Sequence, residues 1–514
     1  MGNPVKLKSS GGNHMNIQEA KQEIIHTIQA YTAKNKWGGY AIPSIRQRPL
    51  LLIGPPGIGK TAVMEQAAEA CHVGFVSYTM THHTRQSAIG LPYIEHRNFD
   101  GKEYAVTEYT MSEIIASVYR CIEESGCREG LLFLDEINCV SETLAPAMLQ
   151  FLQTKTFGSH RLPEGWVLSA AGNPQEYNKS VREFDIATLD RLKYITVEAD
   201  YGSWRSYALE AGIHGAILSY LDVHPDQFYV LEQTYSSKSF ATARGWEDLS
   251  CILLEYEDLS LPVTSELVGQ YLHKEELARD FNGCYHWYAS CSRSLPILAM
   301  LEGDPEAAKA CHRILTESDF SSQLHLVHLI LSCIGNHLRQ HAALENSLQT
   351  YTGVLERFYR YEKQNHIDNL WDALQPFLTH EKEVLDIRKE HGLSSDEEIC
   401  QVQQSLYDLQ EAGYRFRASG SSEDELQFYA EKERSEKEDA ISHASAQIGR
   451  MTENSLLLFE GAENSAFTVL LSSLLQNNLF SKFIQKHPSP LFEEKKKRLD
   501  FNSREEELKA MLHL

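Results

Sequence analysis

The sequence predicts an α/β domain built on a parallel sheet with flanking helices, followed by two segments that are entirely helical. Short apolar runs alternate with helix-forming stretches over residues 15–199, and this alternation is typical of a parallel sheet covered by helices. Beyond residue 200 the apolar residues recur with the period of a helix. We therefore expect an α/β core over 15–199, an all-α segment over 200–290 and an all-α C-terminal region over 291–514.

Five short apolar runs are predicted to be the strands of the sheet. In chain order they are Leu50–Ile53, Val73–Tyr78, Leu131–Leu134, Val167–Ala171 and Tyr194–Val197. Two hairpins are expected between these strands. Asp100-Gly101 lies inside the alternating segment 93–106 and is a strong turn signal. The second hairpin is expected over 154–166, just before the fourth strand.

Composition and charge disfavour several classes of function. Hydrophobic residues make up 42% of the 514 residues and charged residues 23%, as in ordinary soluble globular proteins. The formal net charge of −23 disfavours non-specific binding to nucleic acids, because an acidic surface repels phosphate backbones. No run approaches the roughly 18 apolar residues that a membrane span requires. The ten cysteines form no C-x-x-C pair, so neither a zinc site nor a disulfide framework is indicated, and we expect a cytoplasmic protein.

Two segments stand apart from the predicted domains. Residues 1–14 have the composition of an engineered tag, so Met15 is the expected native start. Ser419–Ser422 is a soft break, and the charge-dense stretch at 423–440 is expected to form a solvated helix or coiled-coil arm rather than part of a core.

A phosphate-binding loop is predicted between the first strand and the helix that follows it. Gly54-Pro-Pro-Gly-Ile-Gly-Lys-Thr61 matches G-x-x-x-x-G-K-[ST] in the strand–loop–helix context that this motif requires. Its backbone N–H groups would surround the phosphates, Lys60 would neutralise the β- and γ-phosphates, and Thr61 would offer its hydroxyl to Mg²⁺. The residues expected to contact ATP are Gly54, Pro55, Pro56, Gly57, Ile58, Gly59, Lys60, Thr61, Ala62 and Asp135.

Polar side chains also end the third and fourth apolar runs. Asp135 and Glu136 follow Leu131–Leu134 directly. Asp135 would hold Mg²⁺, directly or through water, whereas Glu136 would orient and polarise the attacking water. Asn173 follows the fourth strand, where it could hydrogen-bond the γ-phosphate and that water, or serve only as a turn residue before Pro174. Together with the loop, these residues predict ATP hydrolysis, although the sequence does not decide between ATP and GTP.

Taken together, these residues resemble the AAA+ ATPases, and within them the MoxR-like branch, over about residues 17–285. The matching segments are the Walker A loop and the Walker B, sensor-1 and L-D-R-F elements, at Gly54–Thr61, Leu134–Asn138, Gly172–Pro174 and Leu189–Leu192. Leu192 stands where this branch usually has Phe. The resemblance implies that Arg191 is an arginine finger that completes the site of a neighbouring subunit, with Arg182 as its nearest competitor. The two hairpins lie where the branch carries its helix-2 and pre-sensor-1 insertions.

The segment Ala241–Glu247 resembles the sensor-2 stretch of the same family. Thr242 and Ala243 stand in place of the usual Ser and Pro. The resemblance implies that residues 200–290 form a helical lid, with Arg244 reaching the γ-phosphate of its own subunit. It also implies a ring, commonly of six subunits, that acts as a chaperone on a partner protein with a von Willebrand factor A domain.

Three functions are compatible with these features. The first is Mg²⁺-dependent ATP hydrolysis that drives remodelling or maturation of a partner protein. The second is a nucleic-acid-directed NTPase motor of restriction type, which the acidic charge disfavours. The third is a nucleotide-switched interaction scaffold, which the presence of Glu136 and Asn173 disfavours. Residues 291–514 carry no recognisable chemistry, so the sequence does not identify the partner or the number of subunits.

Aromatic residues and histidines cluster around the predicted end of the lid. Tyr285–Tyr288 is expected to be core where the lid meets the C-terminal helices, with a partner-binding patch as the alternative. His325 and His328 lie on a strongly apolar helix and are interpreted as satisfied core or surface groups.

Overall fold

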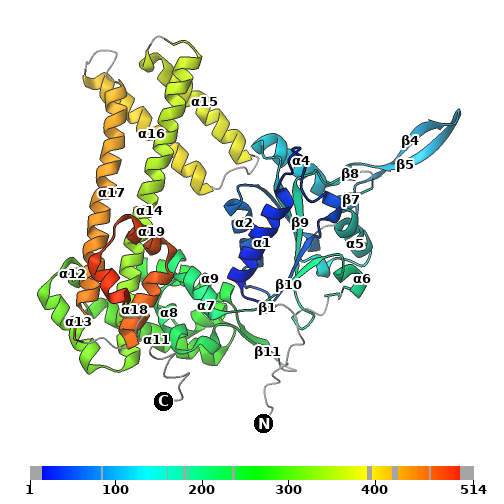
Figure 1. Ribbon diagram of the computed structural model, residues 1–514. Helices are drawn as coiled ribbons and strands as arrows, with labels where there is room; N and C mark the ends of the chain where they lie inside the picture. The colour runs from blue at the N-terminus through cyan, green and yellow to red at the C-terminus, as the bar shows by residue number, and fades with distance from the viewer. Residues whose placement is uncertain are drawn as a thin grey trace. The chain divides into compact units, whose positions relative to one another are not determined.

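The computed structural model describes residues 14–82, 85–158, 160–177, 181–182, 184–233, 238–367, 369–390, 396–419, 426–461 and 465–497. The chain divides into two compact units. Unit 1 comprises Met1–Trp204 with Thr242–Gly245, and unit 2 comprises Arg205–Ala241 with Trp246–Leu514. Figure 1 shows the helices and strands of each unit.

Unit 1 is built on a six-stranded parallel sheet. In spatial order its strands are β1 (His14–Met15), β10 (Lys193–Val197), β2 (Leu50–Ile53), β9 (Trp166–Gly172), β6 (Gly130–Asp135) and β3 (Gly74–Thr79). Every residue of β2 and β9 is buried, as expected for the central strands of a parallel sheet covered on both faces. The five predicted strands are therefore confirmed, each to within one residue at either end.

Strand β1 was not predicted. His14 pairs with Thr196 and Met15 with Val197 at the edge of the sheet. His14 lies in the expected tag, and a two-residue strand is too short to produce an alternating pattern. The sheet therefore begins one residue before the expected native start.

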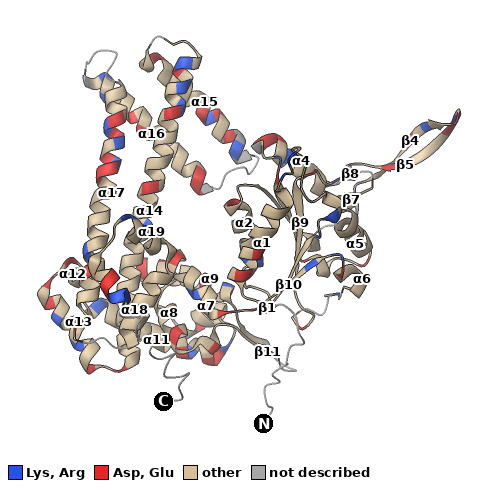
Figure 2. Ribbon diagram, viewed as in Figure 1, with Lys and Arg blue, Asp and Glu red and all other residues tan. Residues whose placement is uncertain are grey.

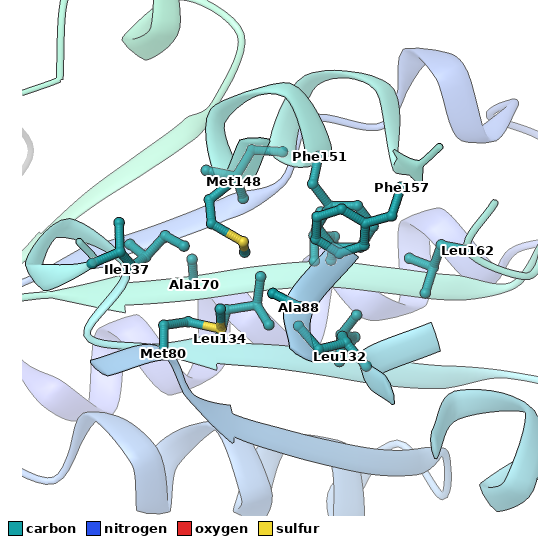
Figure 3. Packing of buried hydrophobic residues seen from close by; sticks show 14 of the residues in the cluster. Met80, Ala88, Leu132, Leu134, Ile137, Met148, Phe151, Phe157, Leu162 and Ala170 are labelled. Atoms are coloured by element: carbon teal, nitrogen blue, oxygen red, sulfur yellow. The ribbon is translucent and has the colours of Figure 1, made fainter. Parts of the chain in front are cut away.

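Helices pack against the sheet of unit 1 and enclose its core. The longer ones are α1 (Ile17–Thr32), α2 (Lys60–Ala70), α4 (Glu113–Ser125) and α5 (Ala145–Thr154), and the shorter ones are α3 (Arg85–Ile89) and α6 (Ile186–Leu189). Met148 and Phe151 of α5 face Leu134 of β6 and Ala170 of β9 in an apolar cluster beside the sheet (Figure 3). This dense packing fixes the strand ends on which the candidate site is built.

Two antiparallel hairpins leave this unit where the sequence predicts them. β4 (Pro92–Phe99) and β5 (Lys102–Tyr109) are joined by Asp100 and Gly101, both with positive φ, as a two-residue type I′ turn requires. The hairpin (Figure 1) is longer than the predicted 93–106. Its side chains are largely exposed. β7 (Thr156–Phe157) and β8 (His160–Arg161) form the second, shorter hairpin.

Unit 2 is mainly helical. It contains α8 (Gly215–Val223) and most of α7 (Tyr201–Ala211) and α9 (Ala243–Asp258), followed by α10 (Ser265–Tyr271), α11 (Glu275–Ser294), α12 (Ile297–Glu302), α13 (Pro305–Glu317), α14 (Phe320–Gln364), α15 (Leu370–Glu390), α16 (Asp396–Ser419), α17 (Leu426–Leu457), α18 (Ser465–Gln476), α19 (Asn478–Lys486) and a last helical stretch over 490–497. No helix in the described part of the chain is long and apolar enough to span a membrane.

One element of unit 2 departs from the expected all-α lid. β11 (Val230–Gln233) and β12 (Lys238–Ala241) form an antiparallel hairpin. The N–H group of Phe240 donates a hydrogen bond to the carbonyl of His273, and the two rings lie 4.5 Å apart. This pairing with a residue more than thirty positions away stabilises β12 in a way that no local sequence pattern reveals.

The charge-dense segment at 423–440 is part of a helical bundle. Its described part begins at Leu426, at the start of α17. Leu426 and Ala430 are fully buried in an apolar cluster with residues of α14, α15 and α16. The charged residues along α17 (Figure 2) include Lys437, whose ammonium lies 2.7 Å from the carboxylate of Asp408 on α16. The segment therefore packs into the bundle through Leu426 and Ala430, whereas residues 431–440 are exposed or half-buried, as in the solvated helix that was expected.

A buried ion pair links four helices of unit 2. Arg205 of α7 donates two hydrogen bonds to the carboxylate of Asp222 on α8, at 2.6 and 2.8 Å. It also donates to Gln476 and Ser473 of α18. His328 of α14 lies 2.9 Å from the same carboxylate. Burial acts to raise the pKa of Asp222, but the hydrogen bonds from His328 and Arg205 outweigh it and hold that pKa well below its usual range.

Replacing Asp222 with Ala should destabilise unit 2 by about 3–5 kcal/mol, because a buried guanidinium loses its counter-charge. Denaturant titration followed by circular dichroism measures the change. The matched control is Glu306→Ala, which removes an exposed ion pair with Lys309 and should leave the unfolding midpoint unchanged. Equal midpoints for the Asp222→Ala and wild-type chains would contradict the structural role of this pair.

Candidate functional site

The predicted phosphate-binding loop joins the end of β2 to the start of α2. Gly57 and Gly59 have φ angles of 75° and 90°, a region that residues with a Cβ rarely occupy. A Cβ on Gly54 would lie 2.6 Å from the carbonyl oxygen of Val197. The glycines of the motif therefore allow both the turn of the loop and its close approach to β10.

The ammonium of Lys60 lies inside this loop. Its Nζ donates hydrogen bonds to the carbonyls of Gly54 and Pro55 and to Oδ1 of Asn173, each at 2.9 Å. The side chain is 8% exposed. Burial lowers the pKa of Lys60 to about 8; Asp135 acts in the opposite direction, and Arg244 lowers it further. The lysine and Asn173 meet because β2 and β9, which precede them, are neighbours in the sheet.

The two carboxylates lie at the end of β6. The hydroxyl of Thr61 donates a 2.8 Å hydrogen bond to Oδ2 of Asp135. Glu136 adopts a left-handed backbone conformation with φ 54°, which costs energy for a residue with a Cβ and is often found at functional sites. Its backbone N–H donates to Oδ1 of Asp135 at 2.8 Å. Asp135 therefore lies beside Thr61, whereas the carboxylate of Glu136 accepts its hydrogen bond from another residue of the site.

Two residues of this site were not singled out from the sequence. Thr81 follows β3, and its hydroxyl donates to Oε2 of Glu136 at 2.9 Å. Asn138 is buried, donates from Nδ2 to the carbonyl of Asn173 at 2.8 Å, and accepts from the N–H of Asn173 at 3.3 Å. Thr81 could have been found from its position just beyond a strand that neighbours β6, because side chains at the carboxyl ends of parallel strands converge.

Arg244 lies at the start of α9, beside the loop. Its backbone N–H donates to the carbonyl of Gly57 at 3.1 Å, and its side chain is exposed. Thr242 accepts a hydrogen bond from the N–H of Gly245 at 3.2 Å, which satisfies one free donor of the first turn as an N-cap residue does. Thr242 is therefore the N-cap residue of α9.

The two candidate finger arginines differ in their relation to this cluster: the backbone N–H of Arg182 donates to the carbonyl of Asn138 at 3.0 Å. Arg191 is exposed and comes two residues before β10. Arg182 is also exposed, and its guanidinium lies 2.8 Å from Glu142. Within the part of the chain that the structure describes, neither guanidinium contacts Lys60, Asp135 or Glu136.

The cluster suits a magnesium-bound triphosphate. A hydroxyl and a carboxylate, from Thr61 and Asp135, are the hard oxygen ligands that Mg²⁺ prefers. Lys60 is a buried cation whose hydrogen-bond partners are two carbonyls and an amide, and an anion would stabilise its charge far better. The N-terminus of α2 points its free N–H groups toward the same place.

Comparison with known proteins agrees with this geometry. Residues 49–192 match the AAA domain of the dynein-related subfamily. The fold and this match identify the region as an AAA domain, the nucleotide-binding domain of AAA+ ATPases. The match does not identify the MoxR-like branch, so membership of that branch stays a prediction.

The chain also shares sequence with Lon proteases. It is 26% identical to Lon protease 1 of Hydrogenovibrio crunogenus over 243 residues, which cover 44% of this chain and 26% of that protein. It is 24% identical to the Lon protease of Mycoplasma mycoides over 287 residues, which cover 51% of this chain and 32% of the relative. The chain therefore spans about a third or less of these proteins, which are distant AAA+ relatives.

Proposed function

We propose that this protein hydrolyses ATP in a Mg²⁺-dependent reaction around Lys60 and uses the cycle to remodel a partner protein. The observation that carries the proposal is the convergence of one ammonium, two carboxylates and an amide from the ends of three neighbouring strands. This set supplies a phosphate ligand, metal ligands and a base for water, which phosphoryl transfer to water requires.

Each residue has a distinct role in this proposal. Lys60 transfers its hydrogen bonds from the loop carbonyls to the β- and γ-phosphates, while the loop N–H groups surround them. Thr61 and Asp135 hold Mg²⁺, which neutralises phosphate charge when bound. Glu136 accepts a proton from the water whose oxygen attacks the γ-phosphorus, as ADP leaves.

Two side chains position these groups. Asn138 fixes the backbone of Asn173, which places Asn173 so that its Nδ2 can donate to the γ-phosphate and its Oδ1 can accept from the attacking water. Thr81 holds the Glu136 carboxylate through a hydrogen bond, and releasing this bond lets Glu136 turn toward the water. Arg244 adds positive charge beside the loop.

Remodelling of a partner is supported by the long β4–β5 hairpin. Its exposed apolar residues include Ile94, Phe99 and Tyr104, and exposed apolar side chains gathered on one element are typical of protein-binding sites. By the resemblance to the MoxR-like branch, we propose a partner with a von Willebrand factor A domain. The distant relatives are named as proteases, but this chain covers too little of their length for us to propose proteolysis as its activity.

ATP binding at pH 8 should be accompanied by proton uptake. Burial lowers the pKa of Lys60 to about 8, so about half of these groups lack their proton before binding. A triphosphate beside Nζ stabilises the charged form and raises the pKa, and the affinity therefore falls as the pH rises above 8. Calorimetric titration with ATP in two buffers of different ionisation enthalpy measures the number of protons taken up for each ATP bound. At pH 6.5 Lys60 is already charged, and undiminished uptake there would show that another group is responsible.

We further propose a ring in which Arg191 completes the site of the next subunit. The Arg191→Ala variant alone should release phosphate from Mg-ATP about 10³-fold more slowly, because the transition-state charge loses its partner. A mixture with Lys60→Ala chains should regain activity, since those chains still supply Arg191 to their neighbours. Arg182→Ala is the matched control and should stay active. No recovery in the mixture, together with an inactive Arg182→Ala chain, would assign the finger to Arg182.

A further inference from the structure

A cavity of about 380 Å³ lies between α8, α11 and the start of α14, within unit 2. Two aspartates line it, Asp280 from α11 and Asp319, the N-cap residue of α14. Among the residues that the structure describes, its lining contains no lysine or arginine, and two histidines, His224 and His325, also line it. The charges on its wall are therefore negative and lack a cationic partner inside the cavity.

A buried hydroxyl on the cavity wall has no hydrogen-bond partner. Ser219 of α8 is fully buried and lines the cavity, and its Oγ has no partner among the residues that the structure describes. Buried polar atoms in native proteins are nearly always satisfied. A ligand that reaches Ser219 would supply the missing bond.

Cys284 and one of the two histidines of the cavity, His325, form a pair. Sγ of Cys284 lies 3.4 Å from Nε2 of His325, and Nδ1 of His325 lies 2.5 Å from the carbonyl of Ser321. This arrangement places the ring proton on Nδ1 and makes Nε2 the acceptor of the thiol. Burial raises the pKa of Cys284 to about 11 and lowers the pKa of His325. The pair is therefore not an activated nucleophile, and it adds no positive charge to offset the aspartates.

A metal ion is not the ligand that these residues favour. Within the described ranges, no three His, Cys, Asp or Glu residues lie close enough together to hold one. The aromatic rings of Trp287 and Tyr220 line the cavity instead, and Trp287 packs edge-on against His325 with ring centroids 4.2 Å apart. Aromatic rings attract organic cations through their quadrupole.

We propose that this cavity binds an organic cation, an alkylguanidinium or alkylammonium group. Asp280 and Asp319 pair with its charge, the hydroxyl of Ser219 hydrogen-bonds it, and Trp287 packs against its apolar stem. The source is either a free amine or a lysine or arginine side chain of another protein. The proposal concerns unit 2 alone and is independent of ATP hydrolysis.

The test is titration calorimetry of the full chain with arginine amide, and with citrulline amide as its uncharged isostere. Arginine amide should bind saturably. Citrulline amide should bind at least about tenfold more weakly, because it cannot make the charge-assisted hydrogen bond. Asp280→Asn and Asp319→Asn should each cause a similar loss, and asparagine preserves the helix cap at position 319. Asp258→Asn, an exposed aspartate outside the cavity, is the control and should bind normally.

Further measurements distinguish a free amine from a protein side chain as the ligand, and specific binding from attraction by the acidic surface. Binding of spermidine and arginine amide, but not of a hexapeptide with a central arginine, identifies a free amine; equal or tighter binding of the peptide identifies a protein side chain. Ser219→Ala should weaken binding severalfold without lowering the melting temperature. No saturable binding of any of these cations would overturn the proposal. Binding that Asp280→Asn leaves unchanged would also overturn it, since the acidic surface would then be attracting the cation.

Discussion

Replacing Glu136 with Gln should lower ATP turnover by about 10²–10⁴-fold, the usual contribution of a general base, while ATP remains bound. The change removes the group that accepts the proton of the attacking water and leaves Lys60, Thr61 and Asp135 in place. Gln also keeps an oxygen that can accept the hydrogen bond from Thr81. Phosphate release under saturating Mg-ATP measures the effect, and equilibrium binding of ATP shows that the site is intact.

Glu69→Gln is the matched control for this experiment. Glu69 lies on the exposed side of α2, in the same unit, so its neutralisation changes net charge equally without touching the carboxylates at the end of β6. It should hydrolyse ATP at the wild-type rate. Unchanged turnover by the Glu136→Gln chain would refute the assignment of Glu136 as the base.

Replacing Lys60 with Ala should abolish measurable ATP binding. Two charge-assisted hydrogen bonds to phosphate are lost, which corresponds to about a hundredfold or more in affinity. The carbonyls of Gly54 and Pro55, which accept from Nζ in this structure, would also be left without that donor. Binding of a fluorescent ATP analogue, measured by anisotropy with Mg²⁺ present, gives the affinity of both chains.

The chain offers a close control for this lysine. Lys155 is also buried, and burial likewise lowers its pKa to about 8. Its Nζ donates to Gln47 at 3.2 Å, and it caps α5 rather than facing the loop. Lys155→Met should therefore bind ATP as the wild type does. Equal losses of affinity in the two variants would indicate a general disturbance of unit 1 and not a phosphate contact by Lys60.

The strands and the main polar cluster could be predicted because both depend on local sequence. An apolar run such as Leu131–Leu134 must be buried on both faces, and the glycines and lysine of residues 54–61 have fixed spacing along the chain. Since parallel strands present their carboxyl ends at one edge, Asp135 and Asn173 were expected near Lys60, and the hydrogen bond from Lys60 to Asn173 agrees with that expectation. The catalytic and binding roles of these residues stay predictions.

Other features could not be predicted, because they depend on residues far apart in the chain. The β11–β12 hairpin is supported by His273, and the charged α17 is held by an apolar cluster with three other helices. Thr81 and Asn138 acquire their places only when β3, β6 and β9 are aligned. The hairpin, the α17 packing and Thr81 leave no periodic or motif-like trace in the sequence, and the motif that ends at Asn138 does not reveal its bond to Asn173.

By itself, the sequence determined the nature of the chemistry: a loop, a lysine and two acids whose order and spacing suit phosphoryl transfer. Only the tertiary structure decided the state of those groups and the existence of the cavity in unit 2. The lowered pKa of Lys60 follows from burial, and the charge and unsatisfied hydroxyl of the cavity follow from three helices that meet across more than a hundred residues. The physical reason is that desolvation and electrostatic interactions depend on distance in space, whereas a motif records only distance along the chain.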